Sequence, residues 1–417
     1  LRGYDFEYDG LNRLTTSSYA EGTDMSQNKD KYSENIPQYS PNGSIERLQR
    51  YGKKNNGTFG LIDDLTYQYN GNQIQSISDK AGSLLYDGSF DFKDGANEST
   101  EYFYNANGAL TKDLNKGISQ IEYDMQDNLS CITFNNGFKT KYVYDASDNK
   151  LRTVHEALTT NTTDYIGDFI FEDGKLSKYQ FEGGYCSFDS DLNPTYHYYE
   201  KDHLGSVRMV VNENGIIEQV NHYYPFGGVY GDLSYNSELQ RNKYIGKEFD
   251  HTSGLDWYDH GARMYDAAKG CWDRMDHFCE KYYPNSPYIS CFNIPTRYID
   301  ESGDSAIVLL APYGAHNFGH LAIAIQNENG IWCLYSKNGT YEHAGIWGQE
   351  GSSDTEKHND RGEKKANDIN SLFNDPSINP KADIKGERED VPNNAPEYTE
   401  GYLLYTNSAQ DKKMVEG

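Results

Sequence analysis

One short aromatic pattern recurs along the first half of the chain and limits the folds that it can adopt. An aromatic step, often Tyr-x-Tyr, is followed by Asp or Asn, by a turn rich in Gly and Asn, and by an aliphatic residue. Residues two apart in a strand share one face, so the step predicts rings on one side of a sheet and a turn to the next strand. The copies are Tyr4–Leu14, Tyr67–Ile74, Tyr102–Leu110, Tyr123–Leu129, Tyr142–Leu151 and a weaker Phe169–Leu176.

The spacing of the copies predicts how they assemble. Tyr104, Tyr123 and Tyr144 follow one another at intervals of 19 and 21 residues, which is about one hairpin each. A single hairpin of this kind cannot bury its apolar face, so neighbouring copies must stack. The sequence therefore predicts a mainly β protein in which a long sheet curves or spirals.

Composition supports a folded, well-hydrated β protein. The 417 residues include 37 Tyr and 39 Gly, carry a net charge of -26 and are 14% aromatic. Disordered chains are poor in aromatic residues, so the low mean hydropathy of -0.86 does not indicate disorder. The negative charge disfavours binding to nucleic acid or to an anionic membrane surface.

Two further classes of protein are disfavoured by local patterns. The longest apolar runs, Ala306–Ala311 and Leu321–Ile325, are far shorter than the ~18 residues of a membrane span, so none is expected. The six cysteines include no CxxC pair and no cluster with zinc spacing. We therefore expect neither a metal nor another cofactor.

The aromatic copies resemble the YD repeats of the RHS family. Downstream, Tyr196–Asp232 is similar to the RHS-associated core, and Lys243–Trp272 continues the match. The resemblance covers about residues 1–303 and implies a β-sheet wound into a hollow shell around a carboxy-terminal toxin. It divides the chain into a YD-repeat segment (1–195), a core domain (196–303) and a small α+β effector-like domain (304–417). The residues that match the DHLGxxR signature of the core are Asp202, His203, Leu204, Gly205 and Arg208.

The signature residues allow two interpretations. Asp202, His203 and Arg208 could form a charge-paired catalytic set. Alternatively, they form a polar cluster that fixes a strand–turn–strand corner.

The resemblance also implies a site of self-cleavage. In many RHS proteins the core ends in two Asp-Pro motifs whose aspartates resemble an aspartyl protease pair, and the matching residues are Asp276 and Asp300. Two nearby carboxylates can share a proton and act as base and acid. His277 and Glu301 replace both prolines, which changes the backbone that directs each carboxylate. Cleavage is expected shortly after Gly303; the alternative is a cargo that stays attached.

One arginine of the family motif is replaced as well. The family usually has Gly-Arg before an aromatic residue, and this chain has Gly270-Cys271-Trp272. Arg274 or Arg297 is the expected substitute.

Beyond residue 303 the repeats stop and a new pattern begins. Apolar segments predict strands at 306–311, 321–325, 331–336 and 400–405, and a helix is predicted over 363–373. His320, at the entrance of a strand, is a candidate general base; the alternative is a hydrogen-bonded corner histidine. The segment resembles circularly permuted papain-like hydrolases, which implies Cys333 as nucleophile. The alternatives are a buried structural role for Cys333, which the residues favour, and Ser336 as nucleophile. A metal interpretation would use His320 with other residues, namely His316, His343 and either His358 or Asp354.

The resemblance implies a polymorphic toxin with a hydrolase effector. Such a toxin is made in the bacterial cytoplasm and is secreted or delivered to a target cell, through a contact-dependent or type VI-like system. It has a delivery component and a cognate immunity protein as partners. The chain begins at Leu1 inside a motif, so we expect it to be the tail of a longer protein. The alternative is a cell-surface adhesion or scaffold protein with an inert tail.

Overall fold

The computed structural model describes most of residues 1–303 and five strands beyond them. The described residues are 1–303, except 83, 85–89, 231–235, 237–238 and 282, together with 307–311, 320–326, 332–336, 365–366 and 400–402. The chain forms two compact units, Leu1–Gly303 and Asp304–Gly417. Within the described residues, no helix has the length and apolar character needed to cross a membrane.

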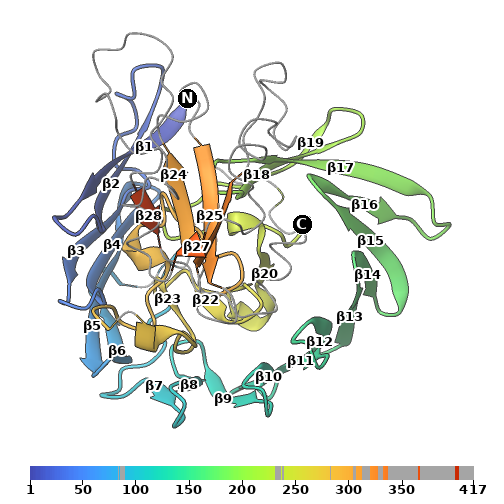
Figure 1. Ribbon diagram of the computed structural model, residues 1–417, viewed down its shortest axis with the longest axis horizontal. Coiled ribbons are helices and arrows are strands. Elements are labelled where there is room, and N and C mark those ends of the chain that lie inside the picture. The colour runs from blue at the N-terminus through green and yellow to red at the C-terminus, as the bar shows by residue number, and fades with distance from the viewer. Residues whose placement is uncertain are drawn as a thin grey trace. The chain divides into compact units, whose positions relative to one another are not determined.

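The first unit consists mainly of antiparallel strands that pair in their order along the chain (Figure 1). A six-stranded sheet contains β1 (Arg2–Tyr8), β2 (Leu14–Glu21), β3 (Glu34–Tyr39), β4 (Ile45–Lys53), β5 (Phe59–Asn70) and β6 (Gln73–Asp79). A thirteen-stranded sheet contains β7 (Tyr102–Tyr104), β8 (Leu110–Asp113), β9 (Ile118–Tyr123), β10 (Leu129–Phe134), β11 (Lys139–Tyr144), β12 (Lys150–Glu156), β13 (Thr160–Ile166), β14 (Phe169–Glu172), β15 (Lys175–Phe181), β16 (Gly184–Phe188), β17 (Pro194–Lys201), β18 (Val207–Asn212) and β19 (Ile217–Val220).

The prediction of a mainly β protein with stacked hairpins is confirmed. The six aromatic copies form the hairpins β1–β2, β5–β6, β7–β8, β9–β10, β11–β12 and β14–β15. The rings of Tyr67 and Tyr69 share a face, with their centroids 6.3 Å apart and their planes 11° from parallel. Strand β17 runs without interruption across residues 195 and 196, where the sequence suggested a domain boundary.

A recurrent hydrogen-bond pattern explains the Asp or Asn at the end of four of the six aromatic copies, namely Asp9, Asn105, Asp124 and Asp145. Oδ1 of Asp9 accepts the backbone N–H groups of Leu11 and Arg13, both at 2.9 Å, and Asn12 adopts a left-handed φ of 62°. A short carboxylate or amide side chain can therefore replace backbone partners in a tight turn. The same pair of contacts, from residues two and four positions later, occurs at Asn105, Asp124, Asp145, Asp189, Asp202 and Asn212.

A small third sheet lies in the segment that follows the long sheets. It consists of β20 (Glu248–Asp250), β21 (Trp257–Asp259), β22 (Met264–Asp266) and β23 (Cys271–Trp272), in that order. Short 3-10 turns occur in the same segment at η2 (Tyr244–Gly246), η3 (Thr252–Gly254), η4 (Cys279–Lys281) and η5 (Cys291–Asn293).

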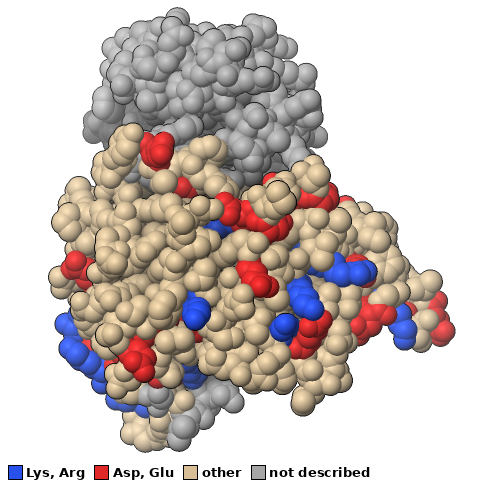
Figure 2. Space-filling view, turned by 90° about the horizontal axis from the view of Figure 1, so that it is seen from below, with Lys and Arg blue, Asp and Glu red and all other residues tan. Residues whose placement is uncertain are grey.

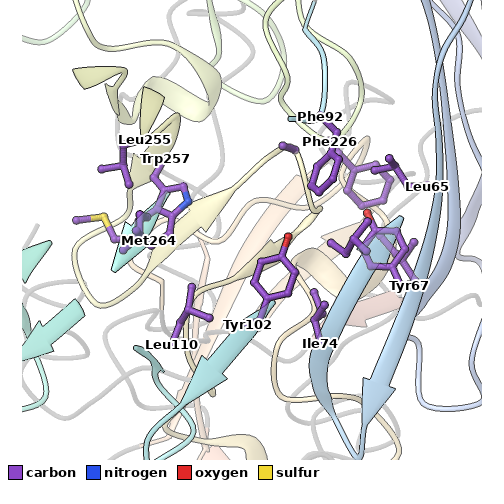
Figure 3. Packing of buried hydrophobic residues seen from close by; sticks show 14 of the residues in the cluster. Leu65, Tyr67, Ile74, Phe92, Tyr102, Leu110, Phe226, Leu255, Trp257 and Met264 are labelled. Carbon is purple, nitrogen blue, oxygen red and sulfur yellow. The ribbon is translucent and has the colours of Figure 1, made fainter. Parts of the chain in front are cut away.

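The third sheet packs against apolar residues of the long sheets. Phe226, Leu255, Trp257 and Met264 belong to one buried cluster with residues of many strands between β2 and β11. Figure 3 shows Tyr102, on β7, among these side chains. The physical reason is that a single sheet must cover its apolar face, and residues 226–268 provide the cover.

Buried charges also join the six-stranded sheet to this segment. The Arg50 guanidinium contacts Glu34 at 2.7 Å and Asp63 at 3.0 Å, and all three side chains are fully buried. Its Nη2 donates to the carbonyl oxygens of Ala267 and Ala268. Arg50 thus links the six-stranded sheet to the segment between β22 and β23, and removing one partner of its buried ion pairs would be strongly destabilising.

Charged side chains at the surface are of both signs. Figure 2 shows acidic and basic groups interspersed over the face of the first unit that it draws.

The second unit contains a five-stranded antiparallel sheet with the order β27-β26-β25-β24-β28. The predicted strands correspond to β24 (Ile307–Ala311), β25 (His320–Gln326), β26 (Trp332–Ser336) and β28 (Glu400–Tyr402). The predicted helix over 363–373 is wrong at β27 (Lys365–Ala366), because that short segment pairs with β26 instead. The remainder of the predicted helix lies outside the described residues.

Candidate functional site

Arg263 occupies a tight turn between strands β21 and β22. The Oδ1 atom of Asp259 accepts the N–H of Gly261 at 2.8 Å, and the N–H of His260 donates to the carbonyl oxygen of Arg263 at 3.1 Å. Gly261 adopts a φ of 94°, which glycine reaches without strain. The turn directs Arg263 into the interior, where its guanidinium lies 4.4 Å from the ring centre of Trp272.

The two aspartates of the predicted cleavage pair meet at this arginine. Nη2 of Arg263 donates to Oδ2 of Asp276 at 2.7 Å and to Oδ2 of Asp300 at 3.1 Å. The exposed fractions of the side chains are 2% for Arg263, 4% for Asp276 and 11% for Asp300. One buried guanidinium therefore contacts two carboxylates that are 24 residues apart in the sequence.

The end of the first unit is held by the same turn. Nε of Arg263 donates to the carbonyl oxygen of Gly303 at 2.5 Å, and the N–H of Gly303 donates to Oδ1 of Asp300 at 2.8 Å. The N–H of Ala262 donates to the carbonyl oxygen of Ser302 at 3.0 Å. The carbonyl group of Gly303 thus lies beside the arginine that contacts both carboxylates.

Close packing at Gly303 leaves no room for a side chain. Gly303 has a φ of 76°, and a Cβ atom there would lie 2.8 Å from the backbone nitrogen of Arg263. Glycine is therefore required at the last residue of the first unit.

His260 fixes the backbone of Asp300. Its Nδ1 lies 2.7 Å from the carbonyl oxygen of Asp300, so this nitrogen carries the proton. Its Nε2 is buried and has no hydrogen-bond partner among the described residues, and its ring stands edge-on to Trp272 at 4.9 Å. Burial lowers the pKa of His260 to about 3, so the ring is neutral near neutral pH.

Arg274 or Arg297 was predicted to replace the family arginine that is missing before Trp272. This prediction is wrong, because neither contacts Asp276 or Asp300 among the described residues. Arg274 donates through Nη2 to the carbonyl oxygen of Ala262, and Arg297 lies 4.9 Å from the ring centre of Tyr8. Arg263 contacts both aspartates instead. Arg263 lies within the range Lys243–Trp272 that resembles the family core, but no role was predicted for it, and the signal that could have found it is an arginine that closes an Asp-x-Gly turn directly before a strand.

The thiol of Cys291 is not poised as a nucleophile. Burial raises the pKa of Cys291 to about 12, so its thiol stays protonated near neutral pH. No group of three or more His, Cys, Asp or Glu side chains in the described part of the chain could hold a metal ion. The chemistry available at Arg263 is therefore that of two carboxylates and a cation.

The DHLGxxR residues form a turn of the recurrent kind. Oδ1 of Asp202 accepts the N–H groups of Leu204 and Ser206, both at 3.0 Å, and Nε of Arg208 donates to its Oδ2 at 2.7 Å. Gly205 adopts a φ of 82° in this turn.

The remaining signature histidine connects this turn to a distant segment. His203 Nε2 lies 3.0 Å from the carbonyl oxygen of Thr296, which follows η5. These contacts are those of the corner interpretation, in which the polar residues position backbone.

The candidate residues of the second unit are separated by the register of its central hairpin. His320, on β25, pairs with Ala311 on β24. Cys333, on β26, pairs with Ile325 on β25. Position 325 is five residues along β25 from His320, or about 16 Å at the rise of a strand. The register does not bring His320 and Cys333 together, and it places Ser336 opposite Ala322, nearer to His320. The metal candidates His316, His343, Asp354 and His358 lie outside the described residues.

Comparison with known proteins finds no matching family model and no matching curated protein. Among solved structures, the chain is similar to the crystal structures of TcdB2-TccC3-TEV and TcdB2-TccC3, with TM-scores of 0.39 and 0.40. It is also similar to a Photorhabdus luminescens Tc holotoxin pore with a mutation in TccC3, with a TM-score of 0.43. Each match is 16% identical and covers 72% of this chain and 18% of the other chain. These values do not carry an assignment of family or function.

Proposed function

We propose that the first unit is a β-shell carrier that cuts its own chain after Gly303 and so separates the second unit, its cargo. The observation that carries this proposal is the Arg263 guanidinium, which contacts Asp276, Asp300 and the carbonyl oxygen of Gly303. The Gly303–Asp304 bond is also the boundary between the two compact units. Cleavage there would release the cargo and leave the shell intact.

The proposed reaction is hydrolysis of one peptide bond. Water adds to the carbonyl carbon of Gly303 while one carboxylate takes its proton. Nε of Arg263 stabilises the negative charge that develops on the carbonyl oxygen. The other carboxyl group, in its protonated form, donates its proton to the nitrogen of Asp304 as the C–N bond breaks. The products are a carboxylate on Gly303 and an amine on Asp304.

Sequencing the new amino terminus tests this reaction. The purified chain should yield a second amino terminus at Asp304, and Asp276→Asn and Asp300→Asn should each prevent its formation. Glu301→Gln is the matched control, since it removes an exposed charge next to Asp300 and should leave cleavage unchanged. A second amino terminus that persists in Asp276→Asn would contradict the proposal.

The separated cargo is proposed to be a toxin with a hydrolase activity that uses His320. Support comes from the central position of β25, which His320 begins, in a sheet formed within the second unit. Expression of residues 306–417 alone should stop bacterial growth, and His320→Ala should relieve it. A harmless fragment would favour the alternative of an adhesion or scaffold protein with an inert tail. Delivery by a secretion system, to a target cell or the cell surface, and neutralisation by an immunity protein belong to the same proposal.

A further inference from the structure

A second constellation of polar side chains lies on the thirteen-stranded sheet, away from Arg263. Oγ of Ser187, on β16, lies 2.8 Å from Nε2 of His197, on β17. Nδ1 of the same histidine lies 2.5 Å from Oε2 of Glu218, on β19. A hydroxyl on one ring nitrogen and a carboxylate on the other is the connectivity of a hydrolytic triad.

The positions of the three side chains follow from the register of the sheet. His197 pairs with Tyr185, two residues before Ser187, so the histidine and the serine share one face. Asn212 of β18 pairs with His197 and donates to Oε1 of Glu218 at 3.1 Å, which holds the carboxylate as it reaches across β18. The Tyr185 ring stacks on the imidazole, with centroids 4.3 Å apart and planes 9° from parallel. The histidine is therefore fixed on both its edges and one face.

Exposure differs among the three in the way that a nucleophile requires. His197 is 6% exposed, and the Glu218 side chain is 23% exposed. Ser187 is partly buried and so is more exposed than His197.

A cation lies beside the serine on the same face. Lys178 of β15 pairs directly with Ser187, and its Nζ lies 5.8 Å from the ring centre of Tyr185. Backbone N–H groups inside an antiparallel sheet are engaged in the ladder, so a side chain must stabilise an oxyanion here. Among the described residues, the register pairs Ser187 with Lys178 and Thr195, and of the two only Lys178 is a cation. Its Nζ also lies 3.9 Å from Oε1 of Glu172.

We propose that Ser187, His197 and Glu218 form a hydrolytic site for small carboxylic esters, with Lys178 as the oxyanion-stabilising group. Ser187 Oγ bonds to the acyl carbon while His197 Nε2 takes its proton and passes it to the departing alkoxide, which leaves as an alcohol. Water then adds to the acyl group, and His197 takes its proton and returns it to Ser187 Oγ. The products are an alcohol and a carboxylic acid, and Glu218 holds the imidazolium formed in each half-reaction.

A fluorophosphonate probe tests this site in the complete, folded chain, because such probes phosphonylate only activated serines. Intact mass should increase by one phosphonyl group, and peptide mapping should place it on Ser187. Ser177→Ala is the matched control on β15, since the Ser177 hydroxyl donates to Glu172 at 3.1 Å rather than to a histidine, and labelling should persist.

Hydrolysis of 4-nitrophenyl acetate provides the second measurement. Ser187→Ala should lose the activity above background, and His197→Gln and Lys178→Met should each lower the rate by about 100-fold or more. A wild-type chain that is folded by circular dichroism yet gains no phosphonyl group would overturn the proposal without need of any variant. Labelling that is unchanged in His197→Gln would overturn it as well. Neither result depends on cleavage at Gly303.

Discussion

Nε of Arg263 donates a hydrogen bond to the carbonyl oxygen of Gly303 at 2.5 Å. The same guanidinium contacts Asp276 and Asp300 through Nη2, so one cation joins two buried carboxylates to the last peptide group of the first unit. The same geometry is expected of a site that only holds the end of the first unit in place and of a site that cuts the chain. They differ in whether the bond after Gly303 is cut.

Replacement of Gly303 by alanine should prevent cleavage. The added Cβ would lie 2.8 Å from the backbone nitrogen of Arg263 and would push the Gly303 carbonyl away from Nε. Gly254→Ala is a matched control, because Gly254 has the same φ of 76° and its Cβ would meet no atom of the described residues within 4 Å. Both variants carry about 1 to 3 kcal/mol of backbone strain. Gel electrophoresis should show loss of cleavage in Gly303→Ala alone; equal cleavage in the two variants would contradict the proposed role of the carbonyl.

Protonation of His260 should destabilise the first unit in acid. Burial lowers its pKa to about 3, whereas an unfolded histidine titrates near 6.5. Between these values the unfolded state binds more protons, so the free energy of unfolding falls as the pH is lowered from about 6.5 towards 3. The loss is on the order of a few kcal/mol.

Urea unfolding at a series of pH values measures this effect. The variant His260→Gln keeps a donor for the carbonyl oxygen of Asp300 but cannot titrate, so its stability should fall less steeply over the same window. Equal slopes for the two proteins would show that His260 is not the group responsible.

Asp202 should tolerate asparagine and not alanine. Asparagine keeps an Oδ1 acceptor for the N–H groups of Leu204 and Ser206, and loses only a partly exposed ion pair with Arg208 worth about 0 to 1 kcal/mol. Alanine leaves both N–H groups without their partner and should reduce the free energy of unfolding by about 1 to 3 kcal/mol. Chemical denaturation of the two variants measures the difference. A loss of cleavage in Asp202→Asn with unchanged stability would instead indicate a catalytic role for the signature.

Local patterns were sufficient to predict the hairpins of the long sheets. Period-two aromatic residues and Asp or Asn before a glycine-rich turn act over a few residues, and the contacts of Asp9 with Leu11 and Arg13 show the mechanism. The strands at 307–311 and 320–326 followed from the same reasoning. Packing of the third sheet against β2–β11 could not be predicted in this way, because no local signal identifies which distant face Trp257 covers.

The candidate site shows the same division. The aspartates Asp276 and Asp300 were found from their resemblance to a family motif, but their meeting at Arg263 depends on how the β21–β22 turn enters the interior. Ser187, His197 and Glu218 were missed as a group because they lie up to 31 positions apart in the sequence. Only the register of the four neighbouring strands β16 to β19 brings them together. Register is set by cumulative strand pairing and not by any one motif.

Intact mass spectrometry of the purified chain tests self-cleavage most directly. After incubation, the wild-type protein should give two chains, of 303 and 114 residues, whose masses sum to that of the whole chain plus one water. The Asp276→Asn variant, incubated in parallel, should remain one chain near 47.5 kDa. A wild-type protein that also stays near 47.5 kDa, with no product after Gly303, would contradict the account.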